Sequence, residues 1–170
     1  MSLNFDFSEV SFQRPPSQGG VFNVKITEVT GYTSNSGNAR ISVVGVIEDG
    51  PEKGCTIKDG INCPKSADDS VKRVWMKFFV CLGLEPDEVA QVFQIKSKSK
   101  PTVEKIADVV RENIVGRSGF CEYLPAVEEG GWPTRKWKTE GQARAAKTFA
   151  AQAAAVKDSE VDPLDAMINV

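Results

Sequence analysis

Hydrophobic and polar positions alternate from residue 20 to residue 29, and the same pattern returns from residue 40 to residue 47. Between them, residues 31–38 are rich in glycine, serine and asparagine, which turns select. A period of two residues is typical of half-buried strands, so a long β-hairpin is predicted over 20–49. The first predicted strand directs three apolar side chains to one face: Phe22, Val24 and Ile26. Two strands bury too little apolar surface to be stable alone, so other segments must pack on the hairpin.

The apolar spacing changes to a helical period after residue 70. Five apolar residues fall at i, i+3, i+4, i+7 and i+11, which predicts one continuous helix face: Val71, Val74, Trp75, Phe78 and Leu82. Asp68, Asp69 or Ser70 can cap the start of this helix, and Gly83 can end it.

Two more helices are expected before the strands return. Residues 86–93 predict a short helix because Pro86 suits a first turn. After the basic loop KSKSKP, Thr102 is a candidate cap for a third helix. The buried face of that helix is predicted to hold Val103, Ile106, Ala107 and Val110.

Three further strands are predicted, at 56–61, 115–124 and 132–139. The element order is therefore three strands, helices and two strands. This is the order of an OB-fold, a five-stranded Greek-key barrel, here mainly β with a helical insertion between the third and fourth strands.

The chain divides into four predicted segments. A lead-in covers 1–19, and the OB-fold domain covers 20–140. The alanine-rich segment 141–157 is either a helix or a flexible arm, and 158–170 is an acidic tail expected to be disordered. Four apolar residues of the lead-in are expected to pack on the domain: Phe5, Phe7, Val10 and Phe12.

Composition narrows the possible chemistry. The chain has no histidine, which removes the commonest general base and the commonest metal ligand. Its cysteines form no CxxC pair, so reduced thiols in or near the core are expected for Cys55, Cys63, Cys81 and Cys121. We therefore expect a non-enzymatic protein without a metal or another cofactor.

Charge is unevenly distributed along the chain. The formal net charge is −2, but the last thirteen residues carry acids and no lysine or arginine. Without those acids, 21 basic residues face 19 acidic ones, and a mildly basic body with an acidic tail often marks polyanion binding. The tail acids are Asp158, Glu160, Asp162 and Asp165.

An OB-fold binds ligands across its second and third strands, between the loops that join strands one to two and four to five. In this chain those loops are 31–38 and 125–131. The segment after the second loop mixes aromatic and cationic residues, as in proteins that stack bases and neutralise phosphates of single strands. The candidate nucleic-acid-binding residues are Tyr32, Arg40, Tyr123, Trp132, Arg135, Lys136, Trp137 and Lys138.

Strand parity leaves some of these roles open. Arg135 and Trp137 point to one face, and Lys136 and Lys138 point to the other. Trp137 is therefore either a core residue or a stacking platform, with no preference between them. Trp132, which follows two glycines, is the stronger stacking candidate.

Several segments together resemble a family of phage-encoded OB-fold single-stranded DNA-binding proteins, often catalogued only as a domain of unknown function. The likeness rests on FDFS at 5–8, the strand GVFNVKITEV, the turn GPEKGCTIKDGI, the helix around Trp75 and the strand VGRSGFCEY. It covers roughly residues 4–140. It implies sequence-tolerant binding of single-stranded DNA in phage replication and recombination.

The resemblance also implies a role for the tail. Tails of this family recruit replication and recombination enzymes and compete with DNA for the cleft. This tail is similar in charge but ends in Ile168, Asn169 and Val170 rather than in an aromatic residue. Partners of the phage or the host are expected through the tail, and a homodimer is compatible with the sequence.

Location and alternative functions follow from what the sequence lacks. No apolar run approaches the roughly 20 residues of a membrane span, and no secretory signal is visible, so the cytoplasm of the infected host cell is expected. The near-neutral charge favours a second hypothesis, an OB-like protein-interaction module that is an adaptor or an inhibitor of a host enzyme. A carboxylate-metal nuclease is disfavoured because the adjacent acids, 68–69 and 128–129, resemble cap or loop residues.

Overall fold

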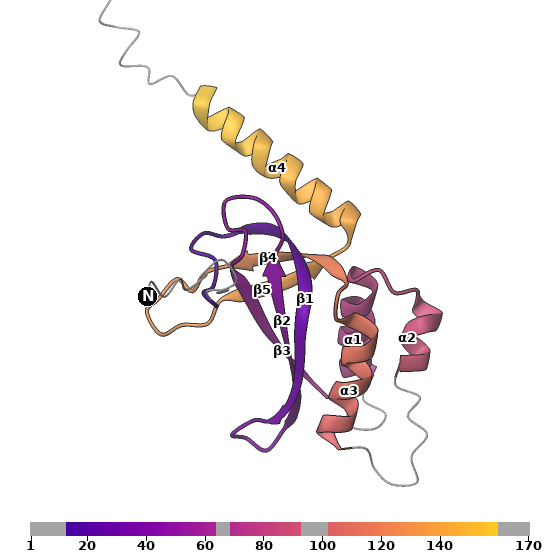
Figure 1. The fold of residues 1–170 in the computed structure, drawn as a ribbon. Helices are drawn as coiled ribbons and strands as arrows, with labels where there is room; N and C mark the ends of the chain where they lie inside the picture. Colours follow the sequence, from indigo (N-terminus) through magenta and orange to yellow (C-terminus); the bar gives the residue numbers. More distant parts are fainter. Residues whose placement is uncertain (1–12, 64–68, 93–101, 160–170) are drawn as a thin grey trace, which may run out of the picture.

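A five-stranded antiparallel sheet forms the centre of the structure, a computed structural model that describes residues 13–63, 69–92 and 102–159 (Figure 1). The strands, which hydrogen-bond in the order β3-β2-β1-β4-β5, are β1 (Gly20–Thr33), β2 (Ala39–Ile47), β3 (Thr56–Asn62), β4 (Ser118–Leu124) and β5 (Thr134–Lys138). The helices are α1 (Asp69–Cys81), α2 (Pro86–Val92), α3 (Val103–Ile114) and α4 (Glu140–Ser159). The sheet curls into a half-barrel, which is compatible with the expected OB-like fold.

The first strand changes its buried parity halfway along. Val24 and Ile26 are fully buried, as the alternation predicts, but the next fully buried residue is Val29. The pairing of β1 with β2 shifts between Ile26 and Glu28, and such a bulge adds one residue and bends the strand. The bend lets one long strand follow the curled sheet and pair with both β2 and β4.

The hairpin turn is shorter than the sequence predicts. β1 continues to Thr33, so Tyr32 belongs to the strand and pairs with Arg40 on β2. Further along β2, a Cβ added at Gly45 would lie 2.3 Å from a methyl carbon of Val24. A side chain at position 45 would therefore collide with Val24, so this position requires glycine.

Helix α1 confirms the predicted element but corrects its buried face. Trp75, Phe78 and Leu82 are buried as predicted, whereas Val74 is 54% exposed. Phe79, which the predicted stripe omits, is fully buried and takes its place in the core. The helix face is therefore rotated toward Phe79, because α1 packs against the sheet through its aromatic side chains.

The end of α1 is built as the sequence predicts. Gly83 has a φ of +81°, the left-handed conformation that favours glycine. The Leu84 N–H donates to the Phe79 carbonyl at 3.1 Å, and the Gly83 N–H donates to the Val80 carbonyl at 3.0 Å. These two bonds form a Schellman motif, which satisfies carbonyls that the helix end leaves free.

Helix α3 lies against β1 and has the predicted cap and three of the four predicted buried residues, while Val103 is only half-buried. The Thr102 Oγ1 accepts from the Lys105 N–H at 3.3 Å. Arg111 donates through Nε and Nη2 to the Val29 carbonyl, at 3.1 and 2.8 Å. The buried residues of α3 are Ile106, Ala107, Val110 and Ile114.

The last two strands begin later than predicted. Val115 is the C-cap of α3, so β4 starts only at Ser118. β5 starts at Thr134, which leaves Trp132 in the preceding loop. Residues 86–92 form α2, and the predicted last residue of that helix, Phe93, lies outside the described residues.

The alanine-rich segment is a helix. α4 begins with a reciprocal capping box, in which Thr139 N–H donates to Gln142 Oε1 at 3.1 Å and Gln142 N–H donates to Thr139 Oγ1 at 3.4 Å. Ala143 is buried, while the far end of α4 extends away from the sheet (Figure 1). Asp158, assigned to the tail by sequence, falls at the end of this helix.

The described part of the lead-in, 13–19, packs beside the start of β3. The Thr56 N–H donates to the Arg14 carbonyl at 2.9 Å. Glu52 accepts from the backbone N–H groups of Ser17 and Gln18, each at 3.1 Å, and also from the Ser17 hydroxyl. The remaining predictions for this segment, on Phe5, Phe7, Val10 and Phe12, lie outside the described residues.

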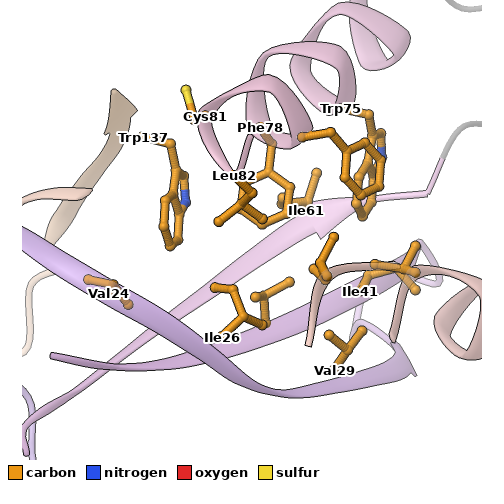
Figure 2. Packing of buried hydrophobic residues seen from close by; sticks show 14 of the residues in the cluster. Val24, Ile26, Val29, Ile41, Ile61, Trp75, Phe78, Cys81, Leu82 and Trp137 are labelled. Atoms are coloured by element: carbon orange, nitrogen blue, oxygen red, sulfur yellow. The ribbon is translucent and has the colours of Figure 1, made fainter. Parts of the chain in front are cut away.

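All four cysteines are buried free thiols, which confirms the prediction for Cys55, Cys63, Cys81 and Cys121. All four belong to one hydrophobic core, of which Figure 2 shows the part around Cys81 and Leu82. Among the described residues, no helix is long and apolar enough to cross a membrane.

Candidate nucleic-acid interface

The two edge strands of the curled sheet are tied together through Asp59. The indole Nε1 of Trp137 on β5 donates to Oδ2 of Asp59 on β3 at 3.0 Å. Arg135 Nε lies 3.6 Å from the other oxygen of this carboxylate, and Arg135 Nη1 donates to the Lys58 carbonyl at 2.7 Å. β5 is therefore held across β3, and the surface between these two strands is continuous.

Trp137 belongs to the core. Its side chain is 8% exposed, and its ring meets Phe78 edge to face, with 5.1 Å between centroids (Figure 2). Arg135 and Trp137 share one face of β5, as strand parity predicts, and both reach Asp59. Of the two roles left open for Trp137, the core role describes its position.

A groove of about 380 Å³ lies between the hairpin end and the β4–β5 loop, and we call it the aromatic groove. It crosses β2 and β3, where the OB-like arrangement predicts a ligand. Four sequence-predicted site residues meet there, together with four that were not predicted: Ser42, Lys58, Asp59 and Gly60. The lining includes Tyr32, Arg40, Ser42, Lys58, Trp132 and Arg135.

The two aromatic residues of this groove come from opposite lips and are both accessible. Trp132 is 87% exposed in the β4–β5 loop, and Tyr32 is 38% exposed on β1. A Cβ added at Gly60 would lie 2.9 Å from the Tyr32 hydroxyl oxygen, so Tyr32 packs closely over the β3 backbone. This packing holds one aromatic side chain in place, while Trp132 stands free on the other lip.

The floor of the aromatic groove contains polar atoms without partners. Arg40 Nη2 donates to the Gly60 carbonyl at 2.8 Å, which fixes the guanidinium on β3. Among the described residues, Arg40 Nε and Ser42 Oγ are buried without a hydrogen-bond partner. Both atoms lie beneath the groove surface, where a partner or an ordered water usually satisfies polar groups.

Charge in the aromatic groove is predominantly positive. Arg40, Lys58 and Arg135 line it, and Asp59 is its single acidic lining residue within the described part of the chain. Asp59 pairs with Arg135, so the net positive charge of the groove comes from Arg40 and Lys58. The groove therefore offers cations between two aromatic side chains, the combination that single-stranded nucleic acids require.

Tyr123 is a correction to the predicted site. It is 5% exposed and pairs with Arg135 across β4 and β5, on the inward face. Burial raises the pKa of its hydroxyl. A base cannot stack on a ring that the sheet and core already cover, so Tyr123 has a packing role.

The two predicted lysines of β5 lie on the other face of the strand. Lys136 is exposed, and Lys138 Nζ lies 3.3 Å from a Glu122 carboxylate oxygen on β4. Neither lines the aromatic groove. The tail acids Glu160, Asp162 and Asp165 lie outside the described residues.

Lys58 could have been found from sequence. The predicted third strand, 56–61, alternates Ile57 and Ile61 with polar residues, so Lys58 falls on the face opposite the core. Ser42 gives no such signal, because a serine within a valine-rich strand is easily taken for an ordinary buried residue.

The described ranges contain no cluster of three or more histidine, cysteine or acidic residues able to hold a metal ion. Compared with known proteins, the chain matches no family model, and the comparison with curated proteins gives no match.

Proposed function

We propose that this chain is a non-enzymatic single-stranded DNA-binding protein with a Greek-key OB-fold. It binds with little sequence preference by stacking bases on aromatic side chains and pairing phosphates with cations. The resemblance to the phage-encoded family supports a role in phage replication and recombination. The observation that carries the proposal is the aromatic groove, in which Tyr32 and Trp132 flank Arg40, Lys58 and Arg135.

Stacking and phosphate contacts both contribute to the affinity of such a groove. Each base stacked on an aromatic side chain contributes about 1–3 kcal/mol, and two platforms together contribute about 2–6 kcal/mol. Each phosphate of a single strand that the protein neutralises adds about 0.7 to the salt slope, the steepness with which the logarithm of the binding constant falls with the logarithm of the salt concentration. The nucleotide between the platforms lies against the cationic side chains of Arg40 and Lys58.

The acidic tail, 158–170, regulates this groove. Its carboxylates mimic phosphates and compete for the same cations, and its free form recruits replication and recombination partners. Because exposed charges are screened beyond about 10 Å at 0.1 M salt, this competition weakens as salt rises.

The experiment is a salt titration of binding to labelled oligo-dT, duplex DNA and RNA of equal length. Oligo-dT should bind more tightly than duplex DNA and should weaken with salt. Removing 158–170 should tighten oligo-dT binding, most strongly at low salt. If neither the full chain nor the truncated chain binds oligo-dT at low salt, the proposed function is wrong.

A second candidate function is a protein-interaction module. The near-neutral charge of the body favours it, and an 87% exposed tryptophan is the kind of side chain that anchors interfaces. Trp132→Ala separates the two: loss of oligo-dT binding supports the first function, whereas loss of only a protein partner supports the second.

A further inference from the structure

The aromatic groove continues into two further grooves. The α1 groove, of about 390 Å³, lies between β3, β5 and α1 and shares Arg40 and Arg135 with the aromatic groove. The α4 groove, of about 420 Å³, lies between β5 and α4 and shares Lys77, Lys136 and Trp137 with the α1 groove. Each groove shares lining residues with the next, so one surface path runs from the hairpin end to α4.

Cations follow this path. Lys77 on α1 and Lys136 on β5 line both later grooves, and Lys138 lines the α4 groove. Neither Lys77 nor Lys136 forms an ion pair with any described residue, so both ammonium groups are open to a ligand anion. The α4 groove has no acidic lining residue in the described part of the chain, so its potential suits phosphates.

The far end of the path has an aromatic side chain. Phe149 is 77% exposed and lines the α4 groove with Gln142, Ala145 and Ala146. These positions follow the spacing i, i+3, i+4 and i+7, so they form one face of α4. The small alanines leave the Phe149 ring accessible from the groove.

The first turns of α4 are fixed on the sheet. The capping box at Thr139 sets where the helix begins, and Ala143 is buried against the body. Lys147 lies over the Phe120 ring of β4, with Nζ 5.5 Å from the ring centroid. These contacts hold the first turns of α4 against the sheet, and Phe149 therefore lies close to β5.

We infer that the DNA strand leaves the aromatic groove, crosses Lys77 and Lys136, and stacks a further base on Phe149. This inference rests on the proposed function and extends its site. The path joins aromatic residues at its two ends with unpaired cations between them, which is the arrangement single-stranded nucleic acids bind. Phe149 and Lys77 are then binding residues that contribute only when the strand is long enough to reach them.

The test compares oligo-dT lengths on the full chain, from about 4 to about 16 nucleotides, the range that one OB-fold covers. Phe149→Ala should weaken binding of the longest oligonucleotide about fivefold or more and leave the shortest unchanged. Lys77→Ala should lower the salt slope for the longest by about 0.7. Lys105→Ala, an exposed lysine of α3 outside all three grooves, is the matched control and should change neither.

The outcomes distinguish this extension from the proposed function. The extension is wrong if Phe149→Ala and Lys77→Ala bind the longest oligo-dT as tightly and with the same salt slope as the parent. If Trp132→Ala then loses affinity at every length, the aromatic groove still stands as the binding site. If neither the parent nor a chain without 158–170 binds any length at low salt, both fail. A loss confined to long oligonucleotides cannot come from unfolding, because unfolding would weaken binding at every length. Phe149 and Lys77 are also exposed, so their removal leaves the core intact.

Discussion

The indole N–H of Trp137 donates to the Asp59 carboxylate at 3.0 Å, and this bond joins the two edge strands of the sheet. The same carboxylate faces Arg135, so one acid serves two side chains of β5. This contact joins the two strands that line both the aromatic groove and the α1 groove.

Asp59→Ala should lower the free energy of unfolding by about 1–3 kcal/mol, because the buried Trp137 N–H loses its acceptor. Urea denaturation measures this change. Asp49→Ala, an exposed acid in the turn after β2, is the control and should stay within about 0.5 kcal/mol of the parent. Equal stability of the two variants would show that the strand contact contributes nothing.

Glu52 should make stability depend on pH. The Ser17 hydroxyl, the Cys55 thiol and two backbone N–H groups donate to its carboxylate, and these bonds hold the pKa below its ordinary value of 4.5. A lowered folded-state pKa gives stability that is present above pH 4.5 and is lost as pH falls through the folded pKa.

The measurement is urea unfolding of the parent and Glu52→Gln at several pH values. The variant should be less stable at pH 7, and the difference should narrow below pH 4.5. Glu129→Gln, in the exposed β4–β5 loop, should show no such trend. A Glu52→Gln deficit that stays constant down to pH 2 would contradict the assigned cause.

The cysteines should be unreactive in the folded protein. Burial, with a smaller contribution from the nearby Asp59 charge, raises the pKa of Cys121 to about 12. Because the thiolate is the reactive form, a thiol reagent at pH 7 should label the folded chain slowly and label all four thiols once urea unfolds it. Fast labelling of Cys121 in the folded chain would mean that its strand opens readily.

Ser42 offers a separation of stability from binding. Its hydroxyl is buried and unpartnered, so Ser42→Ala should leave the free energy of unfolding unchanged or raise it. The same change should leave oligo-dT binding close to that of the parent, because a hydroxyl with almost no accessible surface is out of reach of a nucleotide. A large loss of affinity would show that the hydroxyl becomes accessible when DNA binds.

Local patterns in the sequence predict the elements well, because capping and periodicity act over a few residues. The Thr102 cap, the Gly83 helix end and the face of α3 were all predictable for this reason. The exposure of Val74 and the burial of Phe79 were not, since they depend on how α1 rotates against the sheet.

The candidate site was predictable only in part. Tyr32, Arg40, Trp132 and Arg135 do meet in one groove, because the element order predicts which loops flank it. Trp137 and Tyr123 lie in the core instead, and parity alone cannot tell which face of a strand the core covers. The contact that decides the matter, Trp137 with Asp59, joins residues 78 positions apart.

The most direct test of the central claim is the affinity of Trp132→Ala for oligo-dT at low salt. Trp132 is almost fully exposed, so its removal leaves the fold intact and affects only what binds the groove. Val127→Ala, a fully exposed apolar residue of the same loop outside the groove, is the matched control.

The aromatic groove predicts that Trp132→Ala weakens oligo-dT binding about 5- to 150-fold, the equivalent of about 1–3 kcal/mol for one stacked base, while Val127→Ala binds like the parent. If the parent binds oligo-dT and Trp132→Ala binds it equally well, the aromatic groove is not the place where DNA lies.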